Sequence, residues 1–359
     1  MMIRGVGPVR FRRIVKRAGS ALAAWKASDM EKRSWRDFLS EEQVKALIQG
    51  PDENRLQRLK EFLEERDLWF ITLACDEYPS LLKNIITPPP VLFGKGRLEA
   101  LKRRCIGMVG ARKASRYGMA LASEFASGLA EAGLVVVSGL ALGIDSAAHK
   151  ACLEAGGMTI AVKGCGIDFV YPKRNYKLAC EIGLNGAVIS ELMPGTPPEP
   201  GNFPARNRII SGLSIGIVVV EADKRSGSLI TARLAAEQGR EVMAVPGSVF
   251  SSTSRGCHYL IKQGALLVET VEDILENFGS GESDLVSGAA KGPVVTLSED
   301  MRLVVDKLNG EPQHIDDIAA RCQMPVEKVG AILLELELMD IVMAHGGYKF
   351  SLSKVEVDK

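Results

Sequence analysis

The sequence predicts an α/β protein with a doubly wound parallel sheet, flanked by a small helical segment and a winged helix. Three observations predict this fold class. Strand-like apolar runs alternate with helical stretches through the middle of the chain, and those runs are apolar on both faces, as in a sheet covered by helices on each side. A helix-turn-helix pattern follows near the end. The 359 residues suit two or three domains.

The middle of the chain, residues 71–278, carries the alternation. Because each strand-like run is followed by a helical stretch, the segment is expected to form a Rossmann-like domain. The strand-like runs are 106–110, 134–139, 159–164, 187–192, 215–222 and 241–247, and the helical stretches are 118–132, 146–155, 208–213, 228–238 and 257–263.

The two ends of the chain lack the strand–helix alternation of the middle and predict mainly helices. Residues 1–70 predict short helices at 5–19, 41–49 and 52–67. Residues 279–298 are rich in Gly, Ser and Ala and are interpreted as a flexible linker. Residues 299–359 carry the helix-turn-helix at 315–322 and 326–339, followed by a two-stranded wing at 341–350.

Composition excludes several classes of protein. Hydrophobic residues make up 46% of the chain, which is enough for a core and excludes wholesale disorder. No stretch approaches 18 uncharged apolar residues, and the basic start lacks the apolar region of a secretory signal, so no membrane association is expected. The seven cysteines contain no CxxC pair. They predict free thiols in a reducing cytosol rather than disulfides or a zinc site.

The formal net charge is only +1, but it is unevenly distributed. Residues 1–70 carry 15 Lys+Arg and 11 Asp+Glu, whereas residues 300–359 carry 7 and 11. The chain therefore has a basic front, a balanced middle and an acidic end.

Within the balanced middle, basic residues cluster in the loops that follow the strands. In a doubly wound sheet these loops meet at one edge, where ligands bind. Each loop also leads into a helix N-terminus, which favours anions. Several such sites in a row suit the phosphates of a nucleic-acid backbone, although any one loop cation alone is more often a solvated surface charge. The loop cations are Arg112, Lys113, Arg116, Lys173, Arg174, Arg206 and Arg208, and the Gly/Ser-rich turn is Asp223 to Thr231, with Ser228 as a hydroxyl donor.

Other residues near these loops leave alternatives open. Tyr171, Phe203 and Phe250 have the rings to stack bases, but a loop aromatic is more often a core anchor. Asp145 is either a helix N-cap or a ligand contact, and His149 fits a structural role better than a catalytic one.

Acidic residues also end two of the strands. Glu191 and Glu221 either coordinate a metal or, more in keeping with their surroundings, offset the neighbouring cations.

Several enzyme motifs are missing. The chain has no GxGxxG after the first strand, no GxxxxGK[ST], no GxSxG and no HExxH, and no motif joins a nucleophile to a base. The site is therefore expected to hold a polyanion without turning it over, and no metal or cofactor is expected.

The loops taken together resemble the DprA/Smf family, the bacterial DNA-processing proteins of natural transformation. The resemblance spans about residues 73–278, and extends more loosely to a helix-hairpin-helix or SAM-like front and a winged-helix end. The matching strings are GARKASRYG, VVSGLALGIDSAAHKACLEAGGMTIAVKGCGIDFVYPKRN, ISELMPGTPPEPGNFPARNRIISGLS, VVVEADKRSGSLITARLAAEQGREVMAVPGS and GCHYLIKQGA.

The resemblance implies a cytoplasmic, non-enzymatic protein that needs no cofactor. Such proteins bind single-stranded DNA without sequence preference, protect it, load RecA onto it, and form a homodimer through the Rossmann-like domain. The DNA-binding positions that it implies here are Arg112, Lys173, the stretch Arg206, Asn207 and Arg208, and the turn Ser226, Gly227 and Ser228.

One residue departs from the family pattern, and the winged helix lacks the basic recognition helix that a DNA-reading one should carry. Lys163 stands where the family usually has an aliphatic residue, and either contacts DNA or extends along the strand to its end. The candidate recognition helix carries Glu327, Glu335 and Glu337 against Lys328 alone, so the winged helix is not expected to grip DNA. It is expected to be a protein contact or a regulatory lid, or else a passive appended domain.

Two further hypotheses for the whole protein remain. One is a nucleotide-processing hydrolase of the phosphoribohydrolase kind, which would use the same Gly-rich loops, although PGTPPEPGN poorly matches the turn it needs. The other is an adaptor that docks partners through its acidic end.

Overall fold

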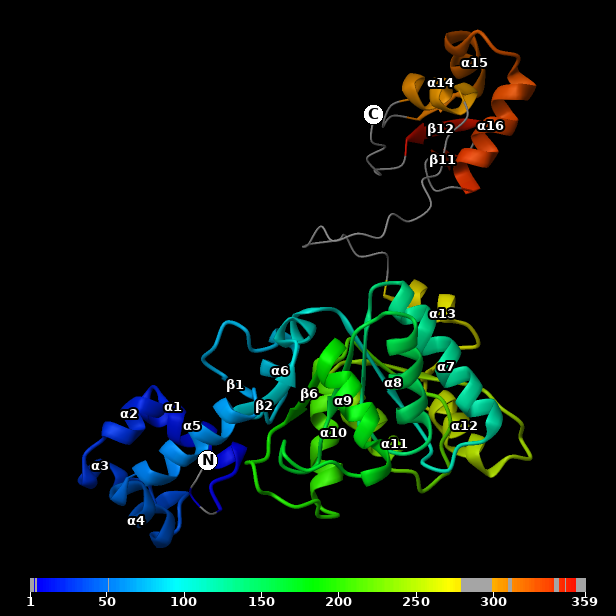
Figure 1. Ribbon diagram of the computed structural model, residues 1–359. Helices are drawn as coiled ribbons and strands as arrows, with labels where there is room; N and C mark the ends of the chain where they lie inside the picture. Colours follow the sequence, from blue (N-terminus) through cyan, green and yellow to red (C-terminus); the bar gives the residue numbers. More distant parts are fainter. Residues whose placement is uncertain are drawn as a thin grey trace. The chain divides into compact units, whose positions relative to one another are not determined.

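The computed structural model describes residues 3, 5–50, 52–278, 299–308, 312–338, 342–345 and 347–352. The chain divides into two compact units, 1–281 and 282–359, each of which is described here by itself (Figure 1). The predicted linker, 279–298, lies outside the described residues.

Seven parallel strands of the first unit form the predicted doubly wound sheet. Their order is β6-β5-β4-β3-β7-β8-β9, so the chain starts in the middle at β3, winds outward to β6, and returns to continue from β7. All six predicted strands are present, and β9 was not predicted. The bounds are Cys105–Val109 for β3, Val135–Ser138 for β4, Thr159–Val162 for β5, Ala187–Ser190 for β6, Gly216–Val219 for β7, Glu241–Ala244 for β8 and Leu266–Leu267 for β9.

Two antiparallel strands extend the sheet beyond β6, and the sequence did not predict them. β2 (Val91–Gly96) pairs with β6, and β1 (Trp69–Thr72) pairs with β2. They were missed because both are short and β2 directly follows a Pro-rich stretch, which reads as a linker. β1 begins at Trp69, beside the predicted domain boundary at residues 70 and 71.

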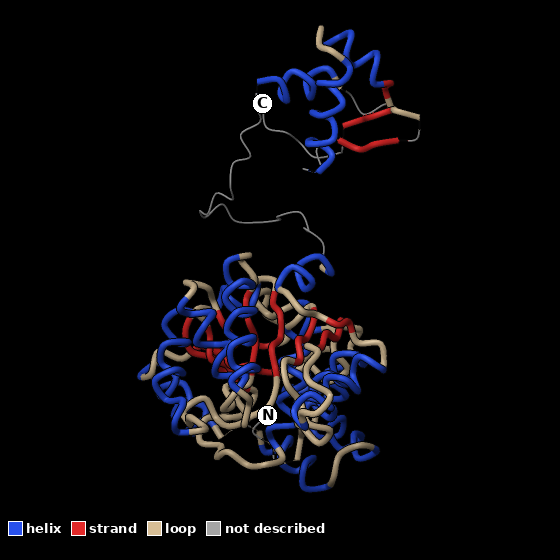
Figure 2. Tube along the Cα trace, turned by 90° about the vertical axis from the view of Figure 1, so that its right-hand side faces the viewer, coloured by secondary structure: helices blue, strands red, loops and turns tan. Residues whose placement is uncertain are grey.

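Helices cover both faces of the sheet, as Figure 2 shows for the strands held between helical layers. Alternate strand residues point to opposite faces, so Val135 and Val137 pack in one apolar cluster and Val136 in another. One face is covered by α7 (Arg116–Glu131), α8 (Ile144–Glu154) and α13 (Val271–Asn277), and the other by α6 (Ser80–Lys83), α10 (Asn202–Leu213), α11 (Ser228–Glu237) and α12 (Arg255–Lys262).

One predicted helix is longer than expected, and the structure contains helices that the sequence did not predict, among them α6, α9 (Tyr176–Asn185) and α13. α10 begins at Asn202, so the segment NFPARNR is helical and not the end of a loop. Pro204 at the third position of this helix is compatible with it, because the first turn of a helix needs no N–H partner. α9 packs Ala179 and Ile182 beside β5 and β6.

The helical front confirms the three helices predicted there. Its buried core contains Ile14, Trp35 and Val44. It contacts the rest of the first unit through Arg12, whose Nη1 donates to the Ile86 carbonyl at 3.0 Å, and through Leu63, which packs in one cluster with Phe93. The helices are α1 (Pro8–Ala18), α2 (Ala21–Lys26), α3 (Asp29–Arg33), α4 (Glu41–Gln49) and α5 (Glu53–Glu65), with a 3₁₀ turn at Ser34–Asp37.

The second unit is a winged helix, as predicted. Its helices pack around Val304, Ile318 and Leu333, and its three short strands pair in the order β10-β12-β11. Lys328, the cation of the candidate recognition helix, forms an ion pair with Asp300 at 2.6 Å. The elements are α14 (Glu299–Lys307), β10 (Gln313–His314), α15 (Ile315–Cys322), α16 (Val326–Leu338), β11 (Val342–His345) and β12 (Lys349–Leu352).

The seven cysteines are all free, as predicted, and only Cys180 is exposed. Among the described residues, no helix is long and apolar enough to cross a membrane. The same residues contain no cluster of three or more His, Cys, Asp or Glu side chains with the arrangement of a metal site.

His149 projects from α8 towards Thr159 at the start of β5 and is fully buried. The Thr159 hydroxyl donates to the Val136 carbonyl at 2.6 Å, and so it accepts from His149 Nδ1 at 2.6 Å. Nε2 is therefore the unprotonated nitrogen, and it has no hydrogen-bond partner among the described residues. Burial, assisted by the nearby positive charge of Arg206, lowers the pKa of His149 to about 3.

The first prediction concerns this histidine and pH. Below about pH 6.5 the unfolded chain protonates His149, whereas the folded chain does not, so its contribution to stability decreases as the pH falls, by up to about 1.4 kcal/mol per pH unit. In urea denaturation at about pH 7.5 and about pH 5.5, the His149→Gln variant is expected to lose less free energy of unfolding between the two conditions than the natural chain. An identical loss in both proteins would contradict the buried neutral state.

Candidate nucleic-acid interface

The sheet reverses its winding between β3 and β7, which are neighbours although three strands, β4, β5 and β6, lie between them along the chain. In open α/β sheets, ligands bind outside the carboxyl ends of the strands at such a reversal. A cavity of about 480 Å³, here called the switch-point cavity, lies there. Among its lining residues are six of the predicted site residues, namely Arg112, Arg206, Asn207, Ser226, Gly227 and Ser228.

An exposed cation and two aromatic rings stand together in this cavity. The Arg112 Cζ lies 5.9 Å from the centroid of the Phe203 ring, and the Tyr171 and Phe203 ring centroids are 5.3 Å apart. The Tyr171 side chain is 46% exposed, so its ring is accessible to a ligand. A guanidinium beside accessible rings is suited to a phosphate with an unstacked base next to it.

The Gly/Ser turn forms the opposite side of the cavity and leads into α11. Ser226 Oγ and Ser228 Oγ are 2.7 Å apart, and the Ser228 N–H donates to Ser226 Oγ at 3.3 Å. Gly227 is exposed at the start of the helix, and the amide of Asn207 contacts its carbonyl at 3.5 Å. Hydroxyls at the N-terminus of a helix are an arrangement that binds anions.

Arg206 is buried and its guanidinium contacts the protein itself. It is 6% exposed, and its Nη1 donates to the carbonyls of Gly139, at 2.8 Å, and Val162. A side chain at position 139 would collide with it, because a Cβ there would lie 2.5 Å from Arg206 Nη2. Burial lowers the pKa of Arg206 to about 10, which still leaves the group charged at neutral pH, and the charge of Asp145 opposes the shift.

The loop after β4 is held by two further buried side chains. Asp145 Oδ2 accepts from the N–H groups of Gly139 and Ala141, at 3.0 and 3.3 Å, and the amide of Asn175 donates to the Leu140 carbonyl at 2.8 Å. Leu140 adopts a φ of 58°, a left-handed conformation that is unfavourable for a non-glycine residue. This loop is thus held in a strained shape at the floor of the switch-point cavity.

Asp145 is therefore not an N-cap, and its Oδ2 is occupied by the backbone of the loop after β4. The N-cap of α8 is Gly143, and Asp145 lies in the first turn of the helix. Burial raises the pKa of Asp145, while the charge of Arg206 and the two backbone N–H groups oppose that shift. Asn175 was missed from the sequence because nothing in its surroundings distinguishes it from an ordinary loop asparagine.

The remaining predicted residues lie outside this cavity. Lys113 and Arg116 are exposed at the start of α7, and Lys173 and Arg174 are exposed on a 3₁₀ turn that follows Tyr171. Arg208 faces away, because its Nη1 and Nη2 both donate to the Glu191 carboxylate, at 2.6 and 2.5 Å.

Three open alternatives from the sequence are decided by these contacts. Glu191 offsets a cation, as expected, but Glu221 does not: it accepts from the N–H and the hydroxyl of Ser115 at 2.9 and 2.5 Å. Lys163 is buried and its Nζ donates to the Ile167 carbonyl at 2.8 Å, so the side chain stabilises a loop.

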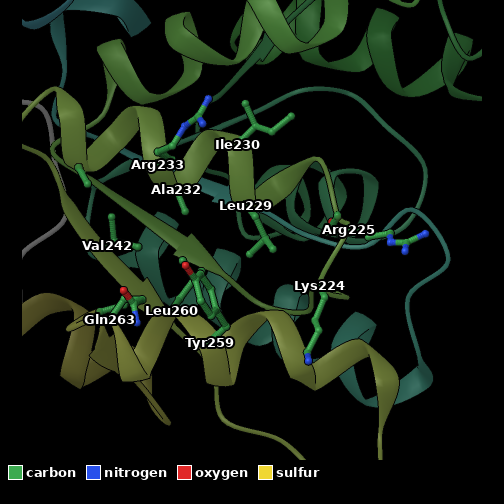
Figure 3. Close-up of a pocket in the computed structure, with 13 residues that line it drawn as sticks. Lys224, Arg225, Leu229, Ile230, Ala232, Arg233, Val242, Tyr259, Leu260 and Gln263 are labelled. Atoms are coloured by element: carbon green, nitrogen blue, oxygen red, sulfur yellow. The ribbon is translucent and has the colours of Figure 1, made fainter.

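A second cavity, of about 520 Å³, lies between α11 and α12. Figure 3 shows Leu229 and Tyr259 reaching into it from the two helices, with Lys224 and Arg225 at one end. It shares Ser226 and Ile230 with the switch-point cavity, so the two cavities meet at the Gly/Ser turn.

Comparison with known proteins agrees with this architecture. The family model described as DNA recombination-mediator protein A matches residues 69–279, and a DprA winged helix domain matches residues 288–348. Protein Smf of Escherichia coli (strain K12) is 42% identical over 293 residues, which cover 80% of this chain and 78% of that protein.

Two solved structures are similar at the level of both fold and sequence. The X-ray structure of DNA processing protein A (DprA) from Streptococcus pneumoniae matches with a TM-score of 0.68 and 39% identity, covering 76% of this chain and 93% of that one. A structure of DNA processing protein A from Helicobacter pylori, which addresses the single-stranded DNA binding mode of that protein, matches with a TM-score of 0.53 and 30% identity, covering 58% and 95%. The chain therefore belongs to the DprA/Smf family of DNA-processing proteins.

Proposed function

We propose that this protein binds single-stranded DNA without sequence preference, protects it, and loads RecA onto it during natural transformation or recombination in the cytoplasm. The observation that carries the proposal is the switch-point cavity, which is lined by an exposed guanidinium, an exposed tyrosine ring beside a half-buried phenylalanine ring, and a helix N-terminus with two serines. The binding mode described for the Helicobacter pylori relative supports it.

The predicted site residues divide into two groups under this proposal. The exposed cations and the turn contact the phosphates directly: Arg112, Lys113, Arg116, Lys173, Arg174, Asn207, Ser226, Gly227 and Ser228. Arg206 and Arg208 support the site from behind, because their guanidinium groups already bind carbonyls and the Glu191 carboxylate. Such support matters because a preorganised site loses less entropy on binding.

The proposed role is not catalytic. Asp145 is the one carboxylate among the residues that line the switch-point cavity, and its Oδ2 already accepts two backbone N–H groups. Release of a free base from a nucleoside monophosphate, measured by chromatography, would instead support the hydrolase hypothesis.

The proposal includes a homodimer formed through the Rossmann-like domain. The cavity between α11 and α12 supports it, because Leu229, Val242 and Leu260 line an open apolar surface there and Tyr259 is 54% exposed. Sedimentation equilibrium is expected to give the mass of two chains. Nuclease digestion of bound DNA tests protection, and RecA filament formation on covered DNA tests loading.

The second prediction concerns Arg112. Replacing it with Ala is expected to weaken binding of single-stranded DNA by about 1.5–3 kcal/mol at low salt, because charge-assisted hydrogen bonds to phosphate are lost. The slope of log affinity against log salt concentration should decrease by about 0.7, the value for one phosphate contact on a single strand. Fluorescence anisotropy with oligonucleotides of two different sequences measures both quantities.

Lys150 provides the control for that experiment. It is an exposed cation on α8 that pairs with Glu154 at 3.5 Å, so Lys150→Ala should leave affinity and salt slope unchanged. An Arg112→Ala variant that binds like this control, or that loses affinity for one sequence alone, would contradict backbone recognition at the switch-point cavity.

The third prediction concerns the winged helix. The candidate recognition helix α16 has one cation among its described residues, Lys328, and that cation is paired with Asp300. A chain that ends at residue 281 is therefore expected to bind single-stranded DNA with the same salt slope as the full chain, measured by the same anisotropy titration. A markedly smaller slope would show that the winged helix contacts phosphates.

A further inference from the structure

A third cavity, of about 510 Å³, lies at the carboxyl ends of β7 and β8, on the same edge of the sheet as the switch-point cavity. Its walls come from the start of α7, the end of β7 and the loop after β8. Its lining residues are Ser115, Tyr117, Glu221, Pro246, Gly247, Ser248, Ser251 and Ser254.

Glu221 places a buried carboxylate in this cavity. The side chain is 4% exposed; Oε1 accepts from the hydroxyls of Ser115 and Thr253, at 2.5 and 3.2 Å, and Oε2 accepts from the Ser115 N–H at 2.9 Å. Within the described residues it pairs with no Lys, Arg or His. Each carboxylate oxygen offers two lone pairs, so Oε2 retains capacity for one further N–H donor.

Exposed apolar residues follow the lining residue Ser248 in the sequence, and one exposed aromatic residue lines the cavity itself. Phe250 is 93% exposed and Val249 is 69% exposed, although both are large apolar residues, and Tyr117 in the cavity wall is 56% exposed. The turn that carries Phe250 is well formed. The Ser251 N–H donates to the Ser248 carbonyl at 3.0 Å and the Phe250 N–H donates to the Ser248 hydroxyl at 3.3 Å, which holds residues 249 and 250 at the tip of the loop.

Two exposed cations adjoin the same walls in the sequence. Arg116 lies between the lining residues Ser115 and Tyr117, and Arg255 directly follows the lining residue Ser254. Cations flanking an aromatic-rimmed, polar cavity are what a single strand requires, because the phosphates and the base must be held at the same time.

We propose that this third cavity binds one unstacked nucleobase of the single strand, whose ring stacks on Phe250 or Tyr117 and whose Watson–Crick edge donates an N–H to Glu221. The inference rests on the proposed function and extends its binding path from the switch point towards β8. Every DNA base carries an N–H donor on that edge, so the pocket accepts all four and is compatible with binding that has no sequence preference.

The lining favours a base over a segment of protein. A protein partner that buries Phe250 would need an apolar surface without charge beside it, whereas the lining of the cavity next to this loop includes four serines and the Glu221 carboxylate. A nucleobase matches both the exposed aromatic ring and the lining with its serines and carboxylate, because its faces are apolar and its edge is polar.

The test uses the full chain with Phe250→Ala, Tyr117→Ala and the double variant, in anisotropy titrations with an oligonucleotide and with a matched strand that has no bases. The control is Phe70→Ala, since Phe70 is 55% exposed on β1, at the other end of the sheet order. The double variant is expected to bind the oligonucleotide about fivefold or more weakly, because stacking contributes about 1–3 kcal/mol per base. Its salt slope should be unchanged, and on the base-free strand it should match the natural chain and the control.

Other results would overturn the inference. Unchanged affinity for the oligonucleotide would exclude a base contact, and an equal loss on both strands would show that the side chains act on phosphates or on the fold. A changed sedimentation mass with unchanged DNA affinity would assign Phe250 to a protein interface. If the natural chain itself does not bind the oligonucleotide, the proposed function fails together with this inference. If the natural chain binds but the double variant binds equally well, only this inference fails.

Discussion

The buried guanidinium of Arg206 joins three segments that are distant in the sequence. It projects from α10 and donates to the carbonyl after β4 and to the carbonyl at the end of β5. Asp145 supplies the compensating charge and binds the N–H groups of the same loop, while Asn175 binds its carbonyls. A buried charge is tolerated only when its hydrogen bonds are satisfied, so these contacts depend on one another. These contacts hold the strained backbone at Leu140, and they therefore also fix the loop at the floor of the switch-point cavity.

This arrangement explains how a nearly neutral chain can present a cationic surface. The net charge is +1, and the middle of the chain carries nearly equal numbers of basic and acidic residues. Two of its cations are bound within the protein. Arg208 pairs with Glu191, and Arg206 donates to backbone carbonyls and is balanced by the nearby charge of Asp145. Arg112, Lys113, Lys173 and Arg174 remain exposed at or near the carboxyl ends of the strands. The local distribution of charge, rather than the total, therefore determines which ligands this edge of the sheet attracts.

The sequence predicted the parallel strands and most of the helices well, because continuous apolar runs between helical stretches have few other structural solutions. In the sheet domain it missed the strands β1, β2 and β9 and the helices α6, α9 and α13, and it read the first half of α10 as a loop. The sequence predicted that the candidate site residues gather at one edge of the sheet, and six of them line a single cavity there, because the carboxyl ends of parallel strands meet at that edge. The sequence did not reveal the contacts of Asn175 and Glu221, because both side chains bind residues that are more than 25 positions away along the chain.

By itself, the sequence determined that the chain builds a doubly wound sheet and a winged helix, and that its basic residues follow the strands. These properties depend on local periodicity and on the order of elements along the chain. Only the tertiary structure decided which cations are exposed and which are bound within the protein. Arg206 and Arg208 lie two residues apart on one helix, yet one binds strand-end carbonyls and the other a carboxylate, whereas Arg112 remains accessible. Such differences depend on where carbonyls and carboxylates from distant segments converge, and nothing in the neighbouring sequence encodes that convergence.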